Sequence, residues 1–361
     1  MSTEKRVSYL ISTKNRAEYL DRTLQNVREF ITPQDELIIM DGGSTDNTTE
    51  IIQKEQIPNI LFSACSNIGH FFRVDEKKAE KLLELFFETT VLMKNPDRSN
   101  PLIPIIVQLS VIDKNEWADG LLTKIINDPK LYSKHFGYIV FELSKLFDPK
   151  FSKDSQKYEE ESNRAFETLN KLVTATQTRI IELIPTIDKT KKVPSDTEIN
   201  DLYLVIHEVV LRLFFAIEKS EDKSNMSKSQ ISNKKRERLF LRFKPLLEKL
   251  IKFPPTETTL LFNSGTLHYF VQIFNEVVEF DPEYVVHTLA DLLKRGDSSY
   301  SLDPLGSDEM LKFGEKIIGD HKDVLQDEKV LKDFIVIVDT FVKNGNPKMM
   351  QFVWRLDEIY R

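Results

Sequence analysis

The chain is poor in cysteine and in long apolar runs. Its 361 residues include one cysteine, Cys65, which excludes an intramolecular disulfide and any zinc site built from several cysteines. No apolar run approaches the ~20 residues that span a bilayer. The N-terminus also lacks the apolar stretch of a signal peptide. We therefore expect a cytoplasmic protein without a membrane span.

Glycine is also scarce, with 11 residues, whereas charged residues make up 30% of the chain. Little glycine beside much Leu, Ile, Lys and Glu favours helices over a loop-rich β-fold. The net charge of −7 argues against nucleic acid as a partner of the whole surface. The length exceeds that of one ordinary core, so we expect more than one domain.

Two motifs that carry phosphate or metal chemistry are missing. The sequence contains no G-x-x-x-x-G-K-[ST] loop, which excludes a P-loop ATPase. Its six histidines are scattered without H-x-x-x-H spacing, so zinc catalysis is not expected and no metal ligand is assigned.

What the chain does have is an N-terminal segment in which strand-like and helix-like patterns alternate. The expected strand, helix, strand, helix and strand cover residues 7–12, 16–30, 37–40, 48–54 and 59–64. Asn15 is the expected N-cap of the first helix. The apolar face of that helix is expected to hold Tyr19, Leu20, Leu24 and Val27. This β-α-β-α-β order predicts parallel strands joined by right-handed crossovers.

After about residue 72 the strand patterns stop and amphipathic helices follow one another. Helices are expected over residues 76–93, 102–111, 116–126, 131–147, 156–187, 195–217, 233–253, 256–280, 282–295, 308–318, 327–344 and 347–360. The sequence thus predicts a small α/β unit over residues 1–70 and an all-α region over residues 71–361. The all-α region is expected to be a helical bundle or a HEAT-like α-solenoid, with a flexible loop near residues 218–233.

The most informative stretch is Asp41-Gly42-Gly43-Ser44-Thr45-Asp46, directly after the strand expected at 37–40. A carboxylate at a strand end can accept hydrogen bonds from ribose hydroxyls or a base N–H. Gly42 and Gly43 leave room for a close approach, and Asp46 or Ser44 is expected to cap the next helix. The alternative is a capped strand-to-helix turn with no ligand.

Three blocks, over residues 7–16, 20–27 and 36–48, resemble the N-terminus of a family 2 glycosyltransferase. They read VSYLISTKNR, LDRTLQNV and ELIIMDGGSTDNT. The resemblance implies a GT-A fold that binds a nucleoside-diphosphate sugar. Thr13 matches the small hydroxyl residue beside the nucleoside, and Asp41 matches the acidic residue that contacts its base or ribose. The nucleotide-binding set that follows is Thr13, Asp41, Gly42, Gly43 and Asp46.

The resemblance covers less than a fifth of the chain and ends before the family's catalytic half. That family places a D-x-D pair on Mg²⁺ or Mn²⁺, and this chain contains no D-x-D. The family's acceptor base has no match either, so the catalytic residues and the cofactor stay unknown. We expect a glycosyltransferase or a remnant of one, with Mg²⁺ or Mn²⁺ only if it is active. The alternative is a non-catalytic helical scaffold that binds protein partners and carries a degenerate N-terminal cap.

Two further stretches bear on partners. Residues 334–361 resemble the final helices of HEAT-like regions in large bacterial phage-defence proteins, which implies a scaffold or sensor role. Residues 234–238 read KKRER and are followed by Arg242, Lys244, Lys249 and Lys252. They predict a solvated helix face, with phosphate or nucleic-acid contact as the alternative.

Overall fold

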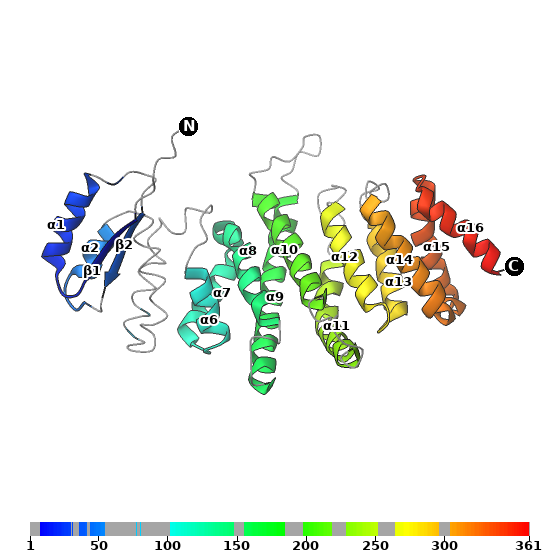
Figure 1. Cartoon of the computed structure of the whole chain (residues 1–361), viewed down its shortest axis with the longest axis horizontal. Coiled ribbons are helices and arrows are strands. Elements are labelled where there is room, and N and C mark those ends of the chain that lie inside the picture. The colour runs from blue at the N-terminus through cyan, green and yellow to red at the C-terminus, as the bar shows by residue number, and fades with distance from the viewer. Residues whose placement is uncertain are drawn as a thin grey trace. The chain divides into compact units, whose positions relative to one another are not determined.

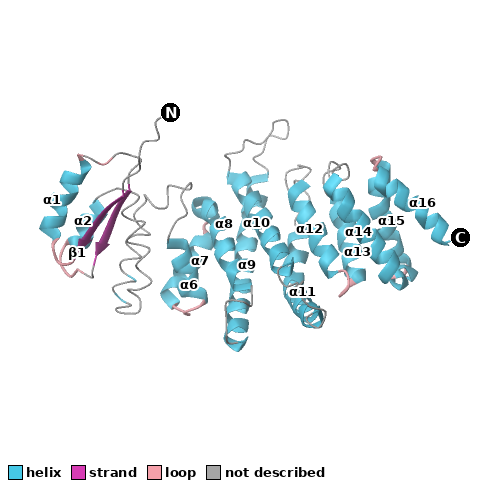
Figure 2. Cartoon of the chain, in the orientation of Figure 1, coloured by secondary structure: helices cyan, strands magenta, loops and turns pink. Residues whose placement is uncertain are grey.

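The computed structural model describes residues 8–29, 31, 36–41, 44–54, 77, 80, 102–147, 155–184, 198–218, 229–251, 264–295 and 304–360. Helices dominate these residues, and one pair of strands lies near the N-terminus (Figure 2). The chain separates into two compact units, Met1–Lys124 and Ile125–Arg361. The domain boundary expected near residue 70 lies outside the described residues.

The first unit begins with a strand–helix–strand–helix order (Figure 1). Its elements are β1 (Ser8–Thr13), α1 (Ala17–Arg28), β2 (Glu36–Asp41) and α2 (Thr48–Lys54). The strands are parallel, in a register that runs from Ser8↔Glu36 to Thr13↔Asp41. The third strand expected at 59–64 lies outside the described residues, so the three-stranded unit stays a prediction. Two further helices follow, α6 (Leu102–Val111) and α7 (Glu116–Asn127).

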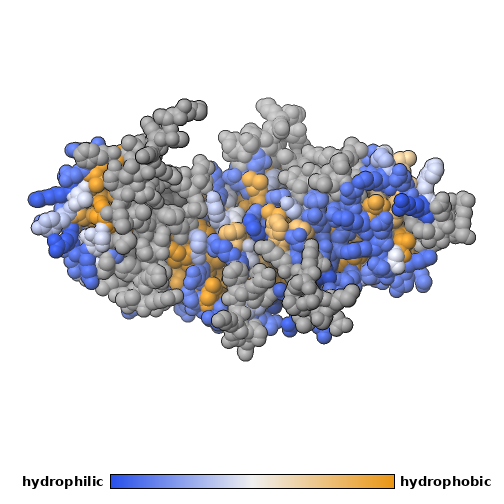
Figure 3. All heavy atoms as spheres, viewed as in Figure 1, coloured by the Kyte–Doolittle hydropathy of each residue, from blue (hydrophilic) through white to orange (hydrophobic). Residues whose placement is uncertain are grey.

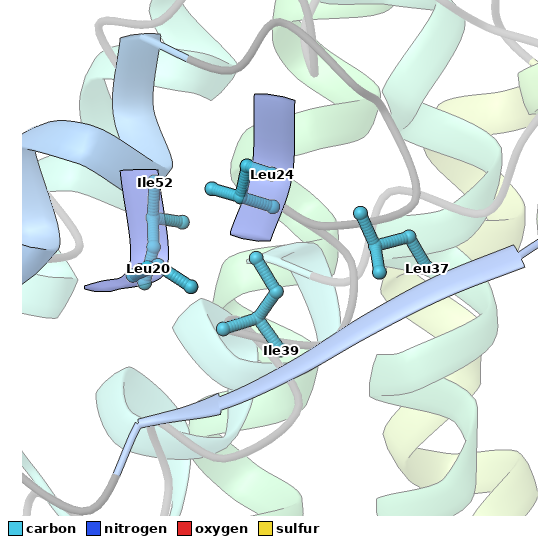
Figure 4. Close-up of a cluster of buried hydrophobic side chains, with 5 residues drawn as sticks. All are labelled: Leu20, Leu24, Leu37, Ile39 and Ile52. Carbon is cyan, nitrogen blue, oxygen red and sulfur yellow. The ribbon is translucent and has the colours of Figure 1, made fainter. Parts of the chain in front are cut away.

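A small apolar core holds the strand pair to its two helices. Leu37 and Ile39 alternate along β2, and Figure 4 shows them together with Leu20, Leu24 and Ile52 from the helices. All five are buried, and each such side chain stabilises the fold by about 1.5–3 kcal/mol. The expectation for Tyr19 was wrong, because its side chain is 63% exposed. With Leu20 and Leu24 facing the strands, Tyr19 is rotated about 100° away.

The described part of the second unit consists of helices, each of which packs on helices one or two positions away in the chain (Figure 1). Their bounds are α8 (Pro129–Ser144), α9 (Ser155–Leu183), α10 (Glu198–Glu218), α11 (Ser229–Ile251), α12 (Ser264–Val277), α13 (Pro282–Arg295), α14 (Pro304–Asp320), α15 (Glu328–Lys343) and α16 (Pro347–Tyr360). Short 3₁₀ helices, η1 (Lys145–Phe147) and η6 (Lys322–Gln326), adjoin α8 and α15. The all-α region is therefore as expected.

These helices form two rows. In one row α8 contacts α10, α10 contacts α12, α12 contacts α14, and α14 contacts α16. In the other row α11 contacts α13 and α13 contacts α15. Gln177 joins α9 to this second row, since its Nε2 donates to the carbonyl of Lys249 on α11 at 3.0 Å. Each helix thus packs on close neighbours in sequence, which is the arrangement of a stacked helical array.

Basic side chains of α11 form ion pairs with carboxylates at the end of α12 and ahead of α13. Arg236 is buried, and its guanidinium pairs with Glu276 at 2.8 Å and with Glu279 at 2.9 Å. Lys244 pairs with Asp281 at 2.8 Å, ahead of α13. The expected solvated face was therefore wrong for Arg236, because the apolar side of α11 carries this cation into contact with the end of α12.

Two helix ends bear on the remaining expectations. Gly345 follows α15 with φ +74°, a left-handed conformation that glycine adopts without strain, and the helix ends close to its expected end at residue 344. The loop expected over 218–233 was wrong at its end, since α11 begins at Ser229. There Asn233 accepts a hydrogen bond from the Arg236 guanidinium, one turn further along the helix.

No described helix has the length and apolar character required to cross a membrane.

Candidate functional site

The candidate site lies where β1 and β2 end. Thr13 and Asp41 are register partners and the last residues of their strands. Adjacent parallel strands are about 4.8 Å apart, so the two residues are neighbours. Asp41 lies two residues after Ile39, and alternation therefore puts its side chain on the helix-covered face, just past the apolar core. Ligands bind at this edge in open α/β sheets.

Thr13 is buried at this edge. Its side chain is 8% exposed, and its hydroxyl has no hydrogen-bond partner within the part of the chain that the structure describes. A buried hydroxyl without a partner costs about 1–3 kcal/mol. Thr13 therefore offers a ligand an unused donor and acceptor beside Asp41.

Asp41 is half-buried and is held by the turn that follows it. The Ser44 hydroxyl donates to Asp41 Oδ1 at 2.5 Å. The Ser44 backbone N–H is shared between both carboxylate oxygens, at 3.2 Å from each. No other side-chain hydrogen bond reaches the Asp41 carboxylate from the described residues, and its Oδ2 receives just the shared one.

Asp46 connects the starts of two helices. Its Oδ2 accepts the backbone N–H of Ala17, the first residue of α1, at 3.0 Å. Its Oδ1 accepts the backbone N–H of Thr48 at 3.1 Å and the Thr48 hydroxyl at 2.5 Å. The bond from the Thr48 hydroxyl, followed by that from Ala17, holds the pKa of Asp46 below its ordinary value. Asp46 thus caps α2, as expected, and its nucleoside contact stays a prediction.

Asn15 connects the turn after β1 to the turn after β2, a role that the sequence did not predict. The expected N-cap role was wrong, because the N-cap position of α1 is Arg16 and the first N–H is met by Asp46 from the other turn. Asn15 instead has φ 50°, a left-handed conformation that Asn tolerates better than most residues. Its Oδ1 accepts the Thr45 N–H at 2.6 Å, and its own N–H donates to Ser44 Oγ at 2.7 Å.

The remaining expected site residues, Gly42 and Gly43, lie outside the described residues. The residues that are described do not fit a divalent metal, since no group of three or more His, Cys, Asp or Glu side chains converges among them. Asp41 alone, with one oxygen already bonded to Ser44, is a poor substitute for the several oxygen ligands that Mg²⁺ or Mn²⁺ takes.

Comparison with known proteins supports the resemblance drawn from the three sequence blocks. Residues 8–66 match the family model for glycosyl transferase family 2. The match takes in β1, α1, β2 and α2 and therefore the whole turn around Asp41 and Asp46. Neither the curated proteins nor the solved structures yield a match. The similarity to this family is thus confined to the N-terminal segment.

Proposed function

We propose that the N-terminal segment binds a nucleoside-diphosphate sugar and that the chain is a family 2-type glycosyltransferase or a remnant of one. The nucleoside contacts Asp41 and Thr13, with Gly42 and Gly43 allowing its close approach. The observation that carries the proposal is the buried, unpartnered hydroxyl of Thr13 directly across from Asp41 at the strand ends.

The chemistry of this pair suits a nucleoside. The carboxylate of Asp41 accepts hydrogen bonds from ribose hydroxyls or a base N–H, and the Thr13 hydroxyl both donates and accepts. A nucleoside that meets both would remove the cost of the unpartnered Thr13 hydroxyl. The family 2 match over residues 8–66 supports the same class of ligand.

Transfer of the sugar is the second half of the proposal. It needs a group that stabilises the leaving diphosphate and a base that activates the acceptor hydroxyl. The described residues offer neither beside Asp41, so we assign no catalytic residue and derive no step through a metal.

Calorimetry on the full chain tests the proposal, with UDP and GDP titrated in the presence of Mn²⁺. The wild type should bind one of them, and Asp41→Ala should lose that binding, because it removes the acceptor that the nucleoside uses. Asp291→Ala, an exposed carboxylate on α13, is the matched control and should bind as the wild type does. A folded wild type that binds neither nucleotide, or an Asp41→Ala variant that binds as tightly as the wild type, would overturn the proposal.

One observation favours the alternative, a non-catalytic HEAT-like scaffold that holds a protein partner. The last two helices of the two-row stack expose apolar side chains, namely Leu331, Ile335, Met350 and Trp354. Figure 3 shows apolar surface over the region of α15. A larger exposed apolar patch often marks a protein-interaction site. This alternative predicts a fully folded chain that binds neither UDP nor GDP.

A further inference from the structure

Asn15 and Ser44 form a short hydrogen-bond relay that ends on Asp41. The Asn15 backbone N–H donates to Ser44 Oγ at 2.7 Å, and Ser44 Oγ lies 2.5 Å from Asp41 Oδ1. A serine hydroxyl has one proton. Since the Asn15 N–H meets an oxygen lone pair of Ser44, that proton is left for the carboxylate. The direction of the relay is therefore fixed, from Asn15 through Ser44 to Asp41.

The relay depends on the left-handed backbone of Asn15. At φ 50° its N–H points across to the second turn, and its Oδ1 takes the Thr45 N–H at 2.6 Å and the Thr45 hydroxyl at 3.2 Å. Each of these bonds joins residues 29 or 30 positions apart in sequence. Asn15 therefore fixes the turn after β2 to the turn after β1, with Ser44 between them.

The consequence for Asp41 is that its two oxygens differ. Oδ1 takes the short bond from the Ser44 hydroxyl, while Oδ2 takes, from the residues that the structure describes, only the shared Ser44 N–H at 3.2 Å. A carboxylate held at one oxygen loses rotational freedom, and its other oxygen has a defined direction for a ligand.

Resting on the proposed function, we propose that Asn15 and Ser44 are positioning residues of the nucleoside site. They hold Asp41 so that Oδ2 faces the nucleoside beside the Thr13 hydroxyl. Neither residue touches the ligand. Both act by reducing the entropy that Asp41 would otherwise lose on binding.

The test uses four single variants of the full chain, one double variant and Asp41→Ala, with the dissociation constants for UDP and GDP in Mn²⁺ measured by calorimetry and Tm measured alongside. Ser44→Ala removes the relay, and Ser44→Thr keeps the hydroxyl. Asn15→Ala removes the Thr45 bond and disfavours the left-handed backbone, whereas Asn15→Gly keeps that backbone and its N–H. We expect binding to weaken about fivefold in Ser44→Ala, the equivalent of one hydrogen bond, and to be restored in Ser44→Thr.

A double variant at Asn15 and Ser44 shows whether these residues act on nucleotide affinity by positioning Asp41 or only through a general loss of stability. If Asn15 acts through Ser44, Asn15→Ala combined with Ser44→Ala should bind no more weakly than Ser44→Ala alone. Asn15→Gly should bind more tightly than Asn15→Ala, even where both lower Tm. The inference is overturned if Ser44→Ala and Asn15→Ala bind as the wild type does while Asp41→Ala loses binding. That pattern leaves the proposed function intact, whereas a wild type without binding rejects both. Should Ser44→Ala not fold, the comparison of Asn15→Gly with Asn15→Ala decides.

Discussion

At the scale of single residues, two carboxylates of one turn have separate tasks. Asp46 has bonds at both oxygens, to α1 and to α2, so it is a structural cap. Asp41 is held at Oδ1, and among the described residues its Oδ2 accepts only the shared Ser44 N–H. Thr13, across from it, carries a buried hydroxyl with no partner among the described residues. A site that keeps polar groups unpaired gives up stability for binding.

Thr13→Val tests this exchange directly. Valine has the shape of threonine without the hydroxyl, so the variant removes an unpartnered buried group and should raise the free energy of unfolding by about 1 kcal/mol. The same change should weaken nucleotide binding. Thermal unfolding and calorimetry on one preparation measure both effects, and a variant that is less stable than the wild type would contradict the assignment of an unused hydroxyl.

Asp46→Asn tests the cap through its pH dependence. The pKa of Asp46 is lowered in the folded state, so its stabilising effect is present above the unfolded pKa of ~3.9 and is lost as pH falls through the lower folded value. An amide cannot accept at both ends, and Asp46→Asn should therefore lower Tm at neutral pH. The difference in Tm from the wild type should shrink as pH falls below about 4. A difference that stays constant from pH 7 to pH 3 would exclude an effect of the charge.

At the scale of elements, the packing of α14 on α16 depends on a glycine, Gly314, whose lack of a side chain leaves room for a ring of α16. Gly314 faces the ring of Phe352, and a Cβ built on Gly314 would come within 2.8 Å of Phe352 Cζ. Phe352 is only 4% exposed, so its ring has little room to move. On the same helix, a Cβ at Gly319 meets nothing within 4 Å.

Gly314→Ala and Gly319→Ala are therefore a matched pair on one helix. Both gain helix propensity of up to about 1 kcal/mol, but overpacking against Phe352 costs about 1–3 kcal/mol. We expect Gly314→Ala to lower the free energy of unfolding and Gly319→Ala to leave it unchanged or raise it. Urea unfolding measures both, and equal effects at the two positions would show that α16 moves aside without cost.

Arg236 is the second test at this scale. The two terminal nitrogens of its guanidinium donate to Glu276 and to Glu279 at the same time, which the single ammonium of a lysine cannot reproduce. Arg236→Ala leaves two carboxylates unpaired beside α11 and should cost about 1–3 kcal/mol, reduced from a fully buried pair because both glutamates are partly exposed. Arg236→Lys should fall between the wild type and Arg236→Ala in urea unfolding. The exposed neighbour Arg238 serves as control, and Arg238→Ala should have little effect.

For the whole molecule, the division into Met1–Lys124 and Ile125–Arg361 predicts more than one unfolding transition. A nucleotide that binds at Asp41 should raise only the transition of the first unit. At a concentration 100 times its dissociation constant the gain is about 2.7 kcal/mol. Calorimetric scans with and without UDP or GDP measure this, and Asp41→Ala should abolish the shift. A ligand that moves both transitions equally would indicate one cooperative unit.

Much of the fold could be predicted because it is encoded locally. The continuous apolar run over residues 37–40 predicted the second strand, and the amphipathic patterns over residues 327–344 and 347–360 predicted α15 and α16. The expectations that failed for Asn15 and Arg236 depended on contacts distant in sequence. Asn15 precedes a helix and resembles an N-cap, but the true cap of that helix is Asp46, 29 residues away. Arg236 belongs to a basic run, yet it is buried because it pairs with Glu276 and Glu279 at the end of α12, about 40 residues later in the sequence.

The shared cap has a consequence for how the turn tolerates change. A library of all single substitutions, sorted once for cellular abundance and once for nucleotide binding, should separate the two acidic positions. Asp46 should be intolerant in both selections, because losing it frees the starts of α1 and α2 together. Asp41 should accept many replacements in the abundance selection and few in the binding selection. At position 13 we expect opposite results in the two selections. The Thr13→Val variant should be enriched when cells are sorted for abundance and depleted when they are sorted for nucleotide binding.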